Sequence, residues 1–196
     1  LIELFDEQGN EYWNKTYLSS DTDYAQTAVV ADNGYIITGM RSGSEGRSIW
    51  AIKTDTEGRE IWNRTYRAGK DCYCIKKITD GYLLGGELST YGCLIKITES
   101  GEMDWVRIYS EVANIFDIVI EENGYVLLGN SPLSLIKTDA HGNQIWLKTY
   151  GWGNVGRAMI RTDDGYAIVG STDRYSLVSS NAWLFLVDKE GNEHWN

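Results

Sequence analysis

The stretch that decides the fold is Gly142-Asn-Gln-Ile-Trp-Leu-Lys-Thr-Tyr150, because its three landmarks recur along the whole chain. In each copy a Gly stands four residues before a Trp, and in most copies a Tyr stands four residues after that Trp. The other copies begin at Gly9, Gly58, Gly101 and Gly191, with Trp13, Trp62, Trp105 and Trp195 as their second landmark. A recurrence with constant internal spacing predicts tandem structural repeats.

A second landmark, the pair Gly-Tyr, falls between these copies at residues 34–35, 81–82, 124–125 and 165–166. The best-defined unit, residues 25–66, reads as four short apolar or alternating runs at 25–31, 35–40, 48–54 and 60–66. Tight turn signals such as Asp-Asn-Gly separate the first run from the second and the third from the fourth, and a longer polar loop follows the second. Helical periodicity is absent. Each unit is therefore predicted to be a four-stranded antiparallel sheet.

Four-stranded units that repeat at intervals of about 45 residues are typical of a β-propeller. We therefore predict an all-β protein with a single propeller domain over residues 1–196. Its repeat units are expected at about 19–66, 67–109, 110–150 and 151–196, and residues 1–18 form a half-blade. Both ends cut through a repeat, which predicts that the chain is a piece or a processed product of a longer protein.

The unit resembles the kelch-like and quinoprotein-like propeller repeats of secreted archaeal and bacterial proteins. The residues that carry the resemblance are Gly34-Tyr-Ile-Ile-Thr-Gly39, Trp50-Ala-Ile-Lys-Thr-Asp55 and residues 142–151. Together with the lack of a catalytic motif in the sequence, the resemblance favours a non-catalytic binding module that is extracellular or on the cell surface. A structural role within a larger propeller is an alternative.

Composition excludes several partners. The formal net charge is −10, so the phosphates of nucleic acid would repel the chain. No apolar run approaches the ~20 residues that span a bilayer, which predicts no membrane insertion. The sequence contains no phosphate-binding loop, nucleophile motif or metal-ligand pattern, so we expect no cofactor and no metal. The Asp residues that precede the turn glycines are interpreted as Asx-turn caps.

The repeated Trp, cation and Tyr on one face of each fourth strand have two interpretations. They could form an aromatic stripe that binds glycans, or they could pack one blade against the next. Recurrence in every unit favours packing, because a binding site rarely needs several copies.

Length variation is concentrated in the loops between second and third strands, which predicts a free ligand-binding face where these loops meet the blade linkers. The predicted ligand is a protein or a glycan. The cations on these loops would make the face positive and attract an anionic ligand such as an acidic glycan. In the competing interpretation, acids on the same loops such as Asp23, Glu45 and Glu87 neutralise the cations locally. The predicted ligand-binding residues are Arg41, Arg47, Arg67, Lys70, Tyr91, Trp152, Arg174 and Tyr175.

The main functional alternative is a propeller enzyme that hydrolyses glycans, which requires two carboxylates about 5–10 Å apart at the central axis. Asp117 is the candidate acid in a first strand, and the partners considered for it are Glu87, Glu111 and Asp173. One acid within a strand does not make a catalytic pair, so the sequence favours a protein that is not an enzyme.

Two closures of the ring are consistent with the sequence. The strand expected over Asn10–Tyr17 could complete the last blade and close a ring of four blades. Alternatively, the blades form an arc of a larger ring, in which case an open ring predicts self-association. A disulfide between Cys93 and either Cys72 or Cys74 is not expected, because the third and first strands that carry them are not neighbours. Cys74 and Cys93 are expected to be buried or half-buried.

Overall fold

The computed structural model describes residues 2–17, 22–151, 154–172 and 181–195, and every regular element in these ranges is a β-strand. The described residues contain no helix, and so none that is long and apolar enough to cross a membrane. The strands form one two-stranded and four four-stranded antiparallel sheets. The predicted all-β class with a propeller-like arrangement of sheets is therefore confirmed.

The first sheet, called the N-terminal pair, consists of β1 (Ile2–Phe5) and β2 (Glu11–Lys15). The four larger sheets are called blades 1 to 4, and each contains four strands that follow one another in the chain. Blade 1 contains β3 (Thr22–Ala31), β4 (Gly34–Gly43), β5 (Gly46–Thr54) and β6 (Glu60–Tyr66). Blade 2 contains β7 (Asp71–Ile78), β8 (Gly81–Leu88), β9 (Tyr91–Ile97) and β10 (Met103–Tyr109). Blade 3 contains β11 (Asn114–Glu121), β12 (Gly124–Asn130), β13 (Ser134–Asp139) and β14 (Gln144–Thr149). Blade 4 contains β15 (Asn154–Arg161), β16 (Gly165–Thr172), β17 (Asn181–Asp188) and β18 (Glu193–Trp195).

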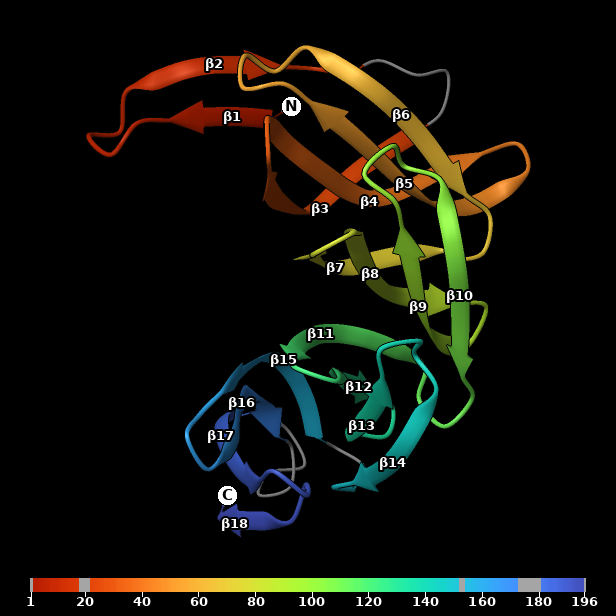
Figure 1. Ribbon diagram of the computed structural model, residues 1–196, viewed down its shortest axis with the longest axis vertical. Coiled ribbons are helices and arrows are strands. Elements are labelled where there is room, and N and C mark those ends of the chain that lie inside the picture. The colour runs from red at the N-terminus through yellow and green to blue at the C-terminus, as the bar shows by residue number, and fades with distance from the viewer. Residues whose placement is uncertain (1, 18–21, 152–153, 173–180, 196) are drawn as a thin grey trace.

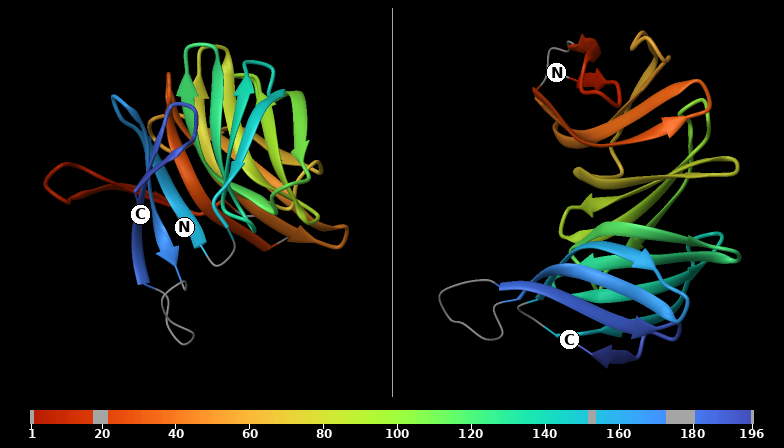
Figure 2. Two further views of the ribbon diagram at one scale, coloured as in Figure 1. Left: turned by 90° about the horizontal axis from the view of Figure 1, so that it is seen from below. Right: turned by 90° about the vertical axis from the view of Figure 1, so that its left-hand side faces the viewer.

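The blades follow one another along a curved arc, with the first strand of each blade on the inner side and the fourth on the outer side (Figure 1). The first strands of successive blades contact one another in order. The N-terminal pair and blade 4 lie at opposite ends of the arc (Figures 1 and 2). Because the strands alternate in direction, the connections between second and third strands share one face with the blade linkers. We call this the loop face, and the opposite face, with the tight turns, the turn face.

The strand pairing differs from a four-bladed ring closed by Asn10–Tyr17. The neighbour of β2 is β1, and the fourth strand beside β17 is β18. The physical reason is that Trp13 and Tyr17 contact the β5–β6 turn of blade 1. These contacts fix β2 at the opposite end of the arc from β17.

The tight turn between the third and fourth strands is stabilised by an aspartate in the N-terminal pair and in blades 1, 3 and 4. In blade 3, the backbone N–H groups of His141 and Asn143 both donate to Asp139 Oδ1, at 2.8 Å. The Asn143 side-chain amide, which donates to Asp139 Oδ2 at 2.9 Å, and these backbone hydrogen bonds stabilise the charged form and lower the pKa of Asp139. The turn glycine that follows, Gly142, has a φ of 74°, a left-handed value that favours glycine. The Asx-turn interpretation is confirmed.

The repeated Trp and Tyr clamp the turn glycine of the next sheet. A Cβ atom placed on Gly101 would lie 3.0 Å from the Trp62 ring, and Tyr66 Oη donates to the Gly101 carbonyl at 2.8 Å. The same contact recurs at each of the four junctions between neighbouring sheets. The other three junctions join Trp13 and Tyr17 to Gly58, Trp105 and Tyr109 to Gly142, and Trp146 and Tyr150 to Gly191. The packing interpretation of the aromatic landmarks is therefore confirmed.

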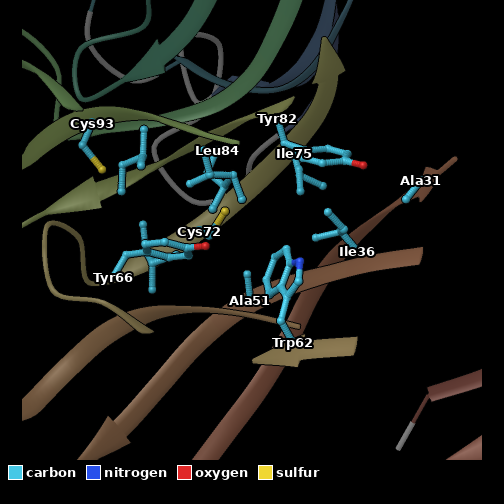
Figure 3. Packing of buried hydrophobic residues seen from close by; sticks show 13 residues of the cluster. Ala31, Ile36, Ala51, Trp62, Tyr66, Cys72, Ile75, Tyr82, Leu84 and Cys93 are labelled. Atoms are coloured by element: carbon cyan, nitrogen blue, oxygen red, sulfur yellow. The ribbon is translucent and has the colours of Figure 1, made fainter. Parts of the chain in front are cut away.

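The core lies between blades. Figure 3 shows the junction of blades 1 and 2, where Ile36, Ala51 and Trp62 face Tyr82 and other residues of blade 2. Corresponding apolar clusters join blade 2 to blade 3 and blade 3 to blade 4. Each blade therefore depends on its neighbours to cover its two faces.

We expect Trp62→Ala to reduce the free energy of unfolding by about 3–5 kcal/mol, because it removes a buried indole and leaves a cavity at a blade junction. Ile61→Ala is the matched control, since Ile61 precedes Trp62 in β6 and is 53% exposed. It should cost less than about 1 kcal/mol. Denaturant unfolding of both variants measures the difference, and equal losses would contradict the assignment of Trp62 to the junction.

Candidate functional site

The predicted ligand-binding residues divide into two groups on the loop face. Arg41 and Arg67 line a cleft of about 200 Å³ at the β4–β5 connection, together with Glu45 and Thr65. The other predicted residues within the described ranges lie nearer to blade 2 or belong to it. They are Arg47 in β5, Lys70 in the linker before β7, and Tyr91 at the exposed start of β9. Trp152, Arg174 and Tyr175 lie outside the described residues, as does Asp173.

Each of the four predicted cations that the structure describes has an acidic partner. Arg41 forms a two-pronged ion pair with Asp23, with both N–O distances at 2.7 Å. The other pairs are Arg67 with Glu45, Lys70 with Glu87 at 3.3 Å and Arg47 with Asp71 at 3.8 Å. The neighbouring acids therefore neutralise these cations locally, and this part of the loop face carries no large positive patch.

Every first strand contains a β-bulge at the same place, close to the loop face. The register of each first strand against its second strand shifts across one residue. The four bulge residues differ in kind, although the bulge itself is repeated. They are Gln26 in β3, Tyr73 in β7, Phe116 in β11 and Arg157 in β15. Bulges commonly redirect a side chain next to a functional site.

Three of these residues stack across three blades. The rings of Tyr73 and Phe116 are parallel within 5°, with centroids 4.5 Å apart. The guanidinium of Arg157 lies over the Phe116 ring at 5.3 Å. At the other end of the row, Tyr73 Oη donates to Glu87 Oε2 at 3.1 Å. We call Asp71, Tyr73, Glu87, Phe116 and Arg157 the inner rim, and Arg47 and Lys70 contact it through their ion pairs.

Sequence analysis did not find Phe116 and Arg157 as site residues. The bulge adds one residue to every first strand, so it leaves no difference in length between units, and only strand pairing reveals it. Tyr73 stands out in the sequence as an aromatic residue outside the repeated landmarks, but it is not among the predicted ligand-binding residues.

Two carboxylates face each other at the inner rim. Asp71 in β7 pairs in register with Glu87 in β8, and the corresponding pairs in the other blades contain no acid. Burial is the largest influence on Asp71 and raises its carboxyl pKa; Arg47 opposes this shift, and Glu87 adds to it. The rim therefore holds a buried acid with a raised pKa beside a second carboxylate.

Asp117, the acid considered for catalysis, joins three blades. Its Oδ2 accepts a hydrogen bond from the Met159 backbone N–H of blade 4 at 2.8 Å, and its Oδ1 lies 2.8 Å from Lys76 Nζ of blade 2. Both oxygens are thus engaged in contacts that hold neighbouring first strands together. The structure does not bring Asp117 together with another acid in a catalytic arrangement among the described residues.

All three cysteines are buried and unpaired, which confirms the burial predicted for Cys74 and Cys93. Burial raises the pKa of Cys72 and of Cys93 to about 12, so both thiols stay protonated at neutral pH. His141 and His194 are exposed. Within the described ranges, no group of three or more His, Cys, Asp or Glu side chains is placed to hold a metal ion.

Comparison with known proteins supports the fold and gives no activity. No protein-family model matches the chain, and no curated protein matches it. The chain superposes on the crystal structure, at 1.35 Å resolution, of a protein of unknown function from Bacteroides caccae, with a TM-score of 0.67 and 14% identity. The superposition covers 98% of this chain and 73% of that one. At this identity the likeness shows the fold alone.

We expect Asp71→Asn to stabilise the protein at neutral pH. Because the pKa of Asp71 is higher in the folded than in the unfolded state, the folded state binds more protons between the two values. Stability therefore falls as pH rises through that window, and the variant escapes this loss. Unfolding free energies across a pH series should show an advantage for the variant at neutral pH that shrinks below about pH 4.

The same substitution at exposed Asp164 controls for the loss of one charge. If Asp71→Asn is less stable than the parent at neutral pH, that result would contradict the raised pKa of Asp71 in the folded state.

Proposed function

We propose that the chain is a non-catalytic β-propeller binding module of the kelch-like kind, located outside the cell or on its surface. In this proposal residues 1–196 form one domain, and the N-terminal pair and blades 1 to 4 are consecutive blades of one propeller. The ligand, a glycan or a protein segment, binds on the loop face across the inner rim.

The observation that carries the proposal is that the backbone geometry of the bulge repeats in every blade, whereas the chemical type of the bulge residue does not. The bulge occurs in all four blades, but its residue changes from Gln to Tyr, Phe and Arg. Positions that only pack, such as the Trp, Tyr and Gly of the clamp, keep their identity from blade to blade. A position whose backbone is held constant while its side chain varies is suited to recognition of a ligand.

The chemistry of the rim suits a ligand with an anionic or strongly polar group. Arg157 is exposed, is held by the Phe116 ring, and has no carboxylate partner among the described residues. Its guanidinium offers several N–H donors in a fixed plane to a carboxylate, a sulfate or a peptide carbonyl. Glu87 and the Tyr73 hydroxyl lie at the other end of the row, where they offer acceptors to sugar hydroxyls or backbone N–H groups.

The ion pairs elsewhere on the loop face support local recognition rather than attraction by a broad positive field. Arg41, Arg47, Arg67 and Lys70 are each neutralised, and the chain as a whole is acidic. A long polyanion such as nucleic acid would therefore be repelled, whereas a ligand with one acidic group at Arg157 would not.

A second candidate, glycan hydrolysis, has one observation in its favour. Asp71 and Glu87 are cross-strand neighbours on one sheet, and residues directly opposite have Cβ atoms about 4.5–5.5 Å apart. Carboxyl groups about 5–5.5 Å apart can act as acid and nucleophile in a retaining glycosidase, and cross-strand neighbours can bring their carboxyl groups to such a separation. Against this, Asp71 is buried, and the ion pairs with Arg47 and Lys70 engage both groups.

We expect Arg157→Ala to weaken the binding of the preferred glycan at least about tenfold, the equivalent of ~1.4 kcal/mol. An array of acidic and neutral glycans identifies the ligand, and calorimetry at several salt concentrations gives the dissociation constant. Affinity should fall as salt rises, because the contact is charged. Arg161→Ala is the matched control, since Arg161 is an exposed arginine in the same strand.

Equal dissociation constants for the Arg157 variant and the parent would contradict the placement of the ligand. No binding to any glycan would contradict the glycan form of the proposal. If the protein hydrolyses a bound glycan and Glu87→Gln abolishes this hydrolysis, glycan hydrolysis replaces non-catalytic binding as the function of the site.

A further inference from the structure

Blade 3 lies beside blade 4 in the arc (Figure 1), and two of its side chains hold the bulge that carries Arg157. Before the bulge, Asn130 Nδ2 donates to the Gly156 carbonyl at 2.9 Å, and the Gly156 N–H donates to Asn130 Oδ1 at 2.8 Å. After the bulge, the Met159 N–H donates to Asp117 Oδ2 at 2.8 Å. Asn130 and Asp117 are 3% and 8% exposed, so these hydrogen bonds are shielded from water. The backbone on both sides of Arg157 is therefore fixed relative to blade 3.

These contacts are a property of this bulge and not of the repeat. Other residues take the places of Asn130 and Asp117 in the two preceding blades. They are Met40 and Thr27 in blade 1, and Glu87 and Cys74 in blade 2. Within the described ranges, none of these side chains forms the corresponding hydrogen bond to the backbone of the next blade. The fold therefore builds its other junctions without such a pair, which indicates that the pair serves Arg157.

The side chain of Arg157 is held as well as its backbone. Its guanidinium lies over the Phe116 ring at 5.3 Å, and that ring stacks on Tyr73. With its face against the ring, the guanidinium offers its edge to a ligand. The edge pairs in a two-pronged contact with a carboxylate, which is planar like the guanidinium. Because the arginine is already ordered, this contact costs less conformational entropy than one made by a free side chain.

The other end of the inner rim offers hydrogen-bond acceptors. A carboxylate has about four lone-pair sites, and in Glu87 the Tyr73 hydroxyl and the Lys70 ammonium use two of them, at 3.1 and 3.3 Å. The remaining sites can accept hydrogen bonds from a ligand. A sugar ring presents several adjacent hydroxyl donors, whereas an extended peptide presents one backbone N–H per residue. A rim with one cation and several acceptors therefore suits a sugar that carries a carboxylate better than it suits an acidic peptide.

We propose that the ligand of the inner rim is a glycan that contains uronic acid, and that Asn130 and Asp117 are positioning residues that hold Arg157 for the uronate carboxylate. This inference rests on the proposed function, because it needs a glycan on the inner rim. It adds the chemical class of the sugar and two residues that set the preference for it. Hydroxyl groups of the same glycan donate to Glu87. Because the chain has a net charge of −10, a glycan in which uronate alternates with a neutral sugar suits the rim better than a polyuronate.

Two probes test the class of ligand, a hyaluronan tetrasaccharide, in which glucuronate alternates with a neutral sugar, and digalacturonate. Each is compared by calorimetry with its own methyl ester, which keeps the sugar and removes the charge. The parent should bind at least one acid at least about tenfold more tightly than its ester. Arg157→Ala should abolish this preference and leave the affinity for the ester unchanged.

The outcomes separate this inference from the proposed function. A parent that prefers neither acid to its ester would overturn the inference. If a neutral glycan then binds the parent and not the Arg157 variant, the proposed function stands without it. Tighter binding of tetraglutamate than of both acids would also overturn the inference, because the rim would then recognise an acidic peptide.

The ratio of the affinities for acid and ester also tests the two positioning residues. Asn130→Ala and Asp117→Ala should each lower this ratio at least about threefold, and neither should change it further in the Arg157→Ala background. Asp117→Asn keeps an acceptor for the Met159 N–H and should keep most of the preference, so it separates the lost hydrogen bond from a failure to fold.

Thr138→Ala is the control, since Thr138 is a buried residue of the same blade that forms a hydrogen bond at its turn end. This variant should be less stable than the parent and should keep the parental ratio. If Asn130→Ala weakens the binding of acid and ester by the same factor, that result would overturn the positioning role, because it indicates a general loss of structure.

Discussion

The structure depends on one contact, the packing of an indole and a tyrosine of one sheet against the turn glycine of the next. At the junction of blades 1 and 2, only glycine fits at position 101, because a side chain there would collide with the Trp62 ring. The hydroxyl of Tyr66 then fixes the turn through its carbonyl group. Since a four-stranded sheet cannot bury both faces by itself, repetition of this contact converts separate sheets into a continuous arc.

Because the contacts that hold the blades together lie away from the loop face, the residues of the loop face can vary without loss of the fold. The clamp and the Asx turns lie on the turn face and the outer strands, where their residues recur from blade to blade. The bulge residues lie at the opposite end of the first strands, where Tyr73, Phe116 and Arg157 stack in a row that no repeat requires. A rigid frame that presents unlike side chains at equivalent positions is the physical basis for the binding function proposed for the chain.

Sequence and structure agree where one unit repeats another, and they differ where the chain departs from repetition. The spacing from Gly to Trp to Tyr predicted the repeats and the packing role of the aromatic residues, and the apolar runs and turn signals between these landmarks predicted the four strands of each unit and their tight turns. The ion pairs of Arg47 with Asp71 and of Lys70 with Glu87 could not be predicted in the same way, because they join side chains whose proximity depends on strand register. For the same reason the sequence identified Asp117 as a catalytic candidate, whereas its oxygens are engaged by Met159 and Lys76.

The most direct test of the clamp compares Gly101→Ala with Gly9→Ala, at concentrations where the chain is monomeric. Both glycines have left-handed φ values, 80° and 83°, so the backbone cost of alanine is the same at the two positions. Only at Gly101 does the new methyl group meet a Trp ring. We therefore expect Gly101→Ala to lose about 1–3 kcal/mol more unfolding free energy than Gly9→Ala. Equal losses at the two positions would contradict the account, because they would mean that the indole contact contributes nothing to holding the blades together.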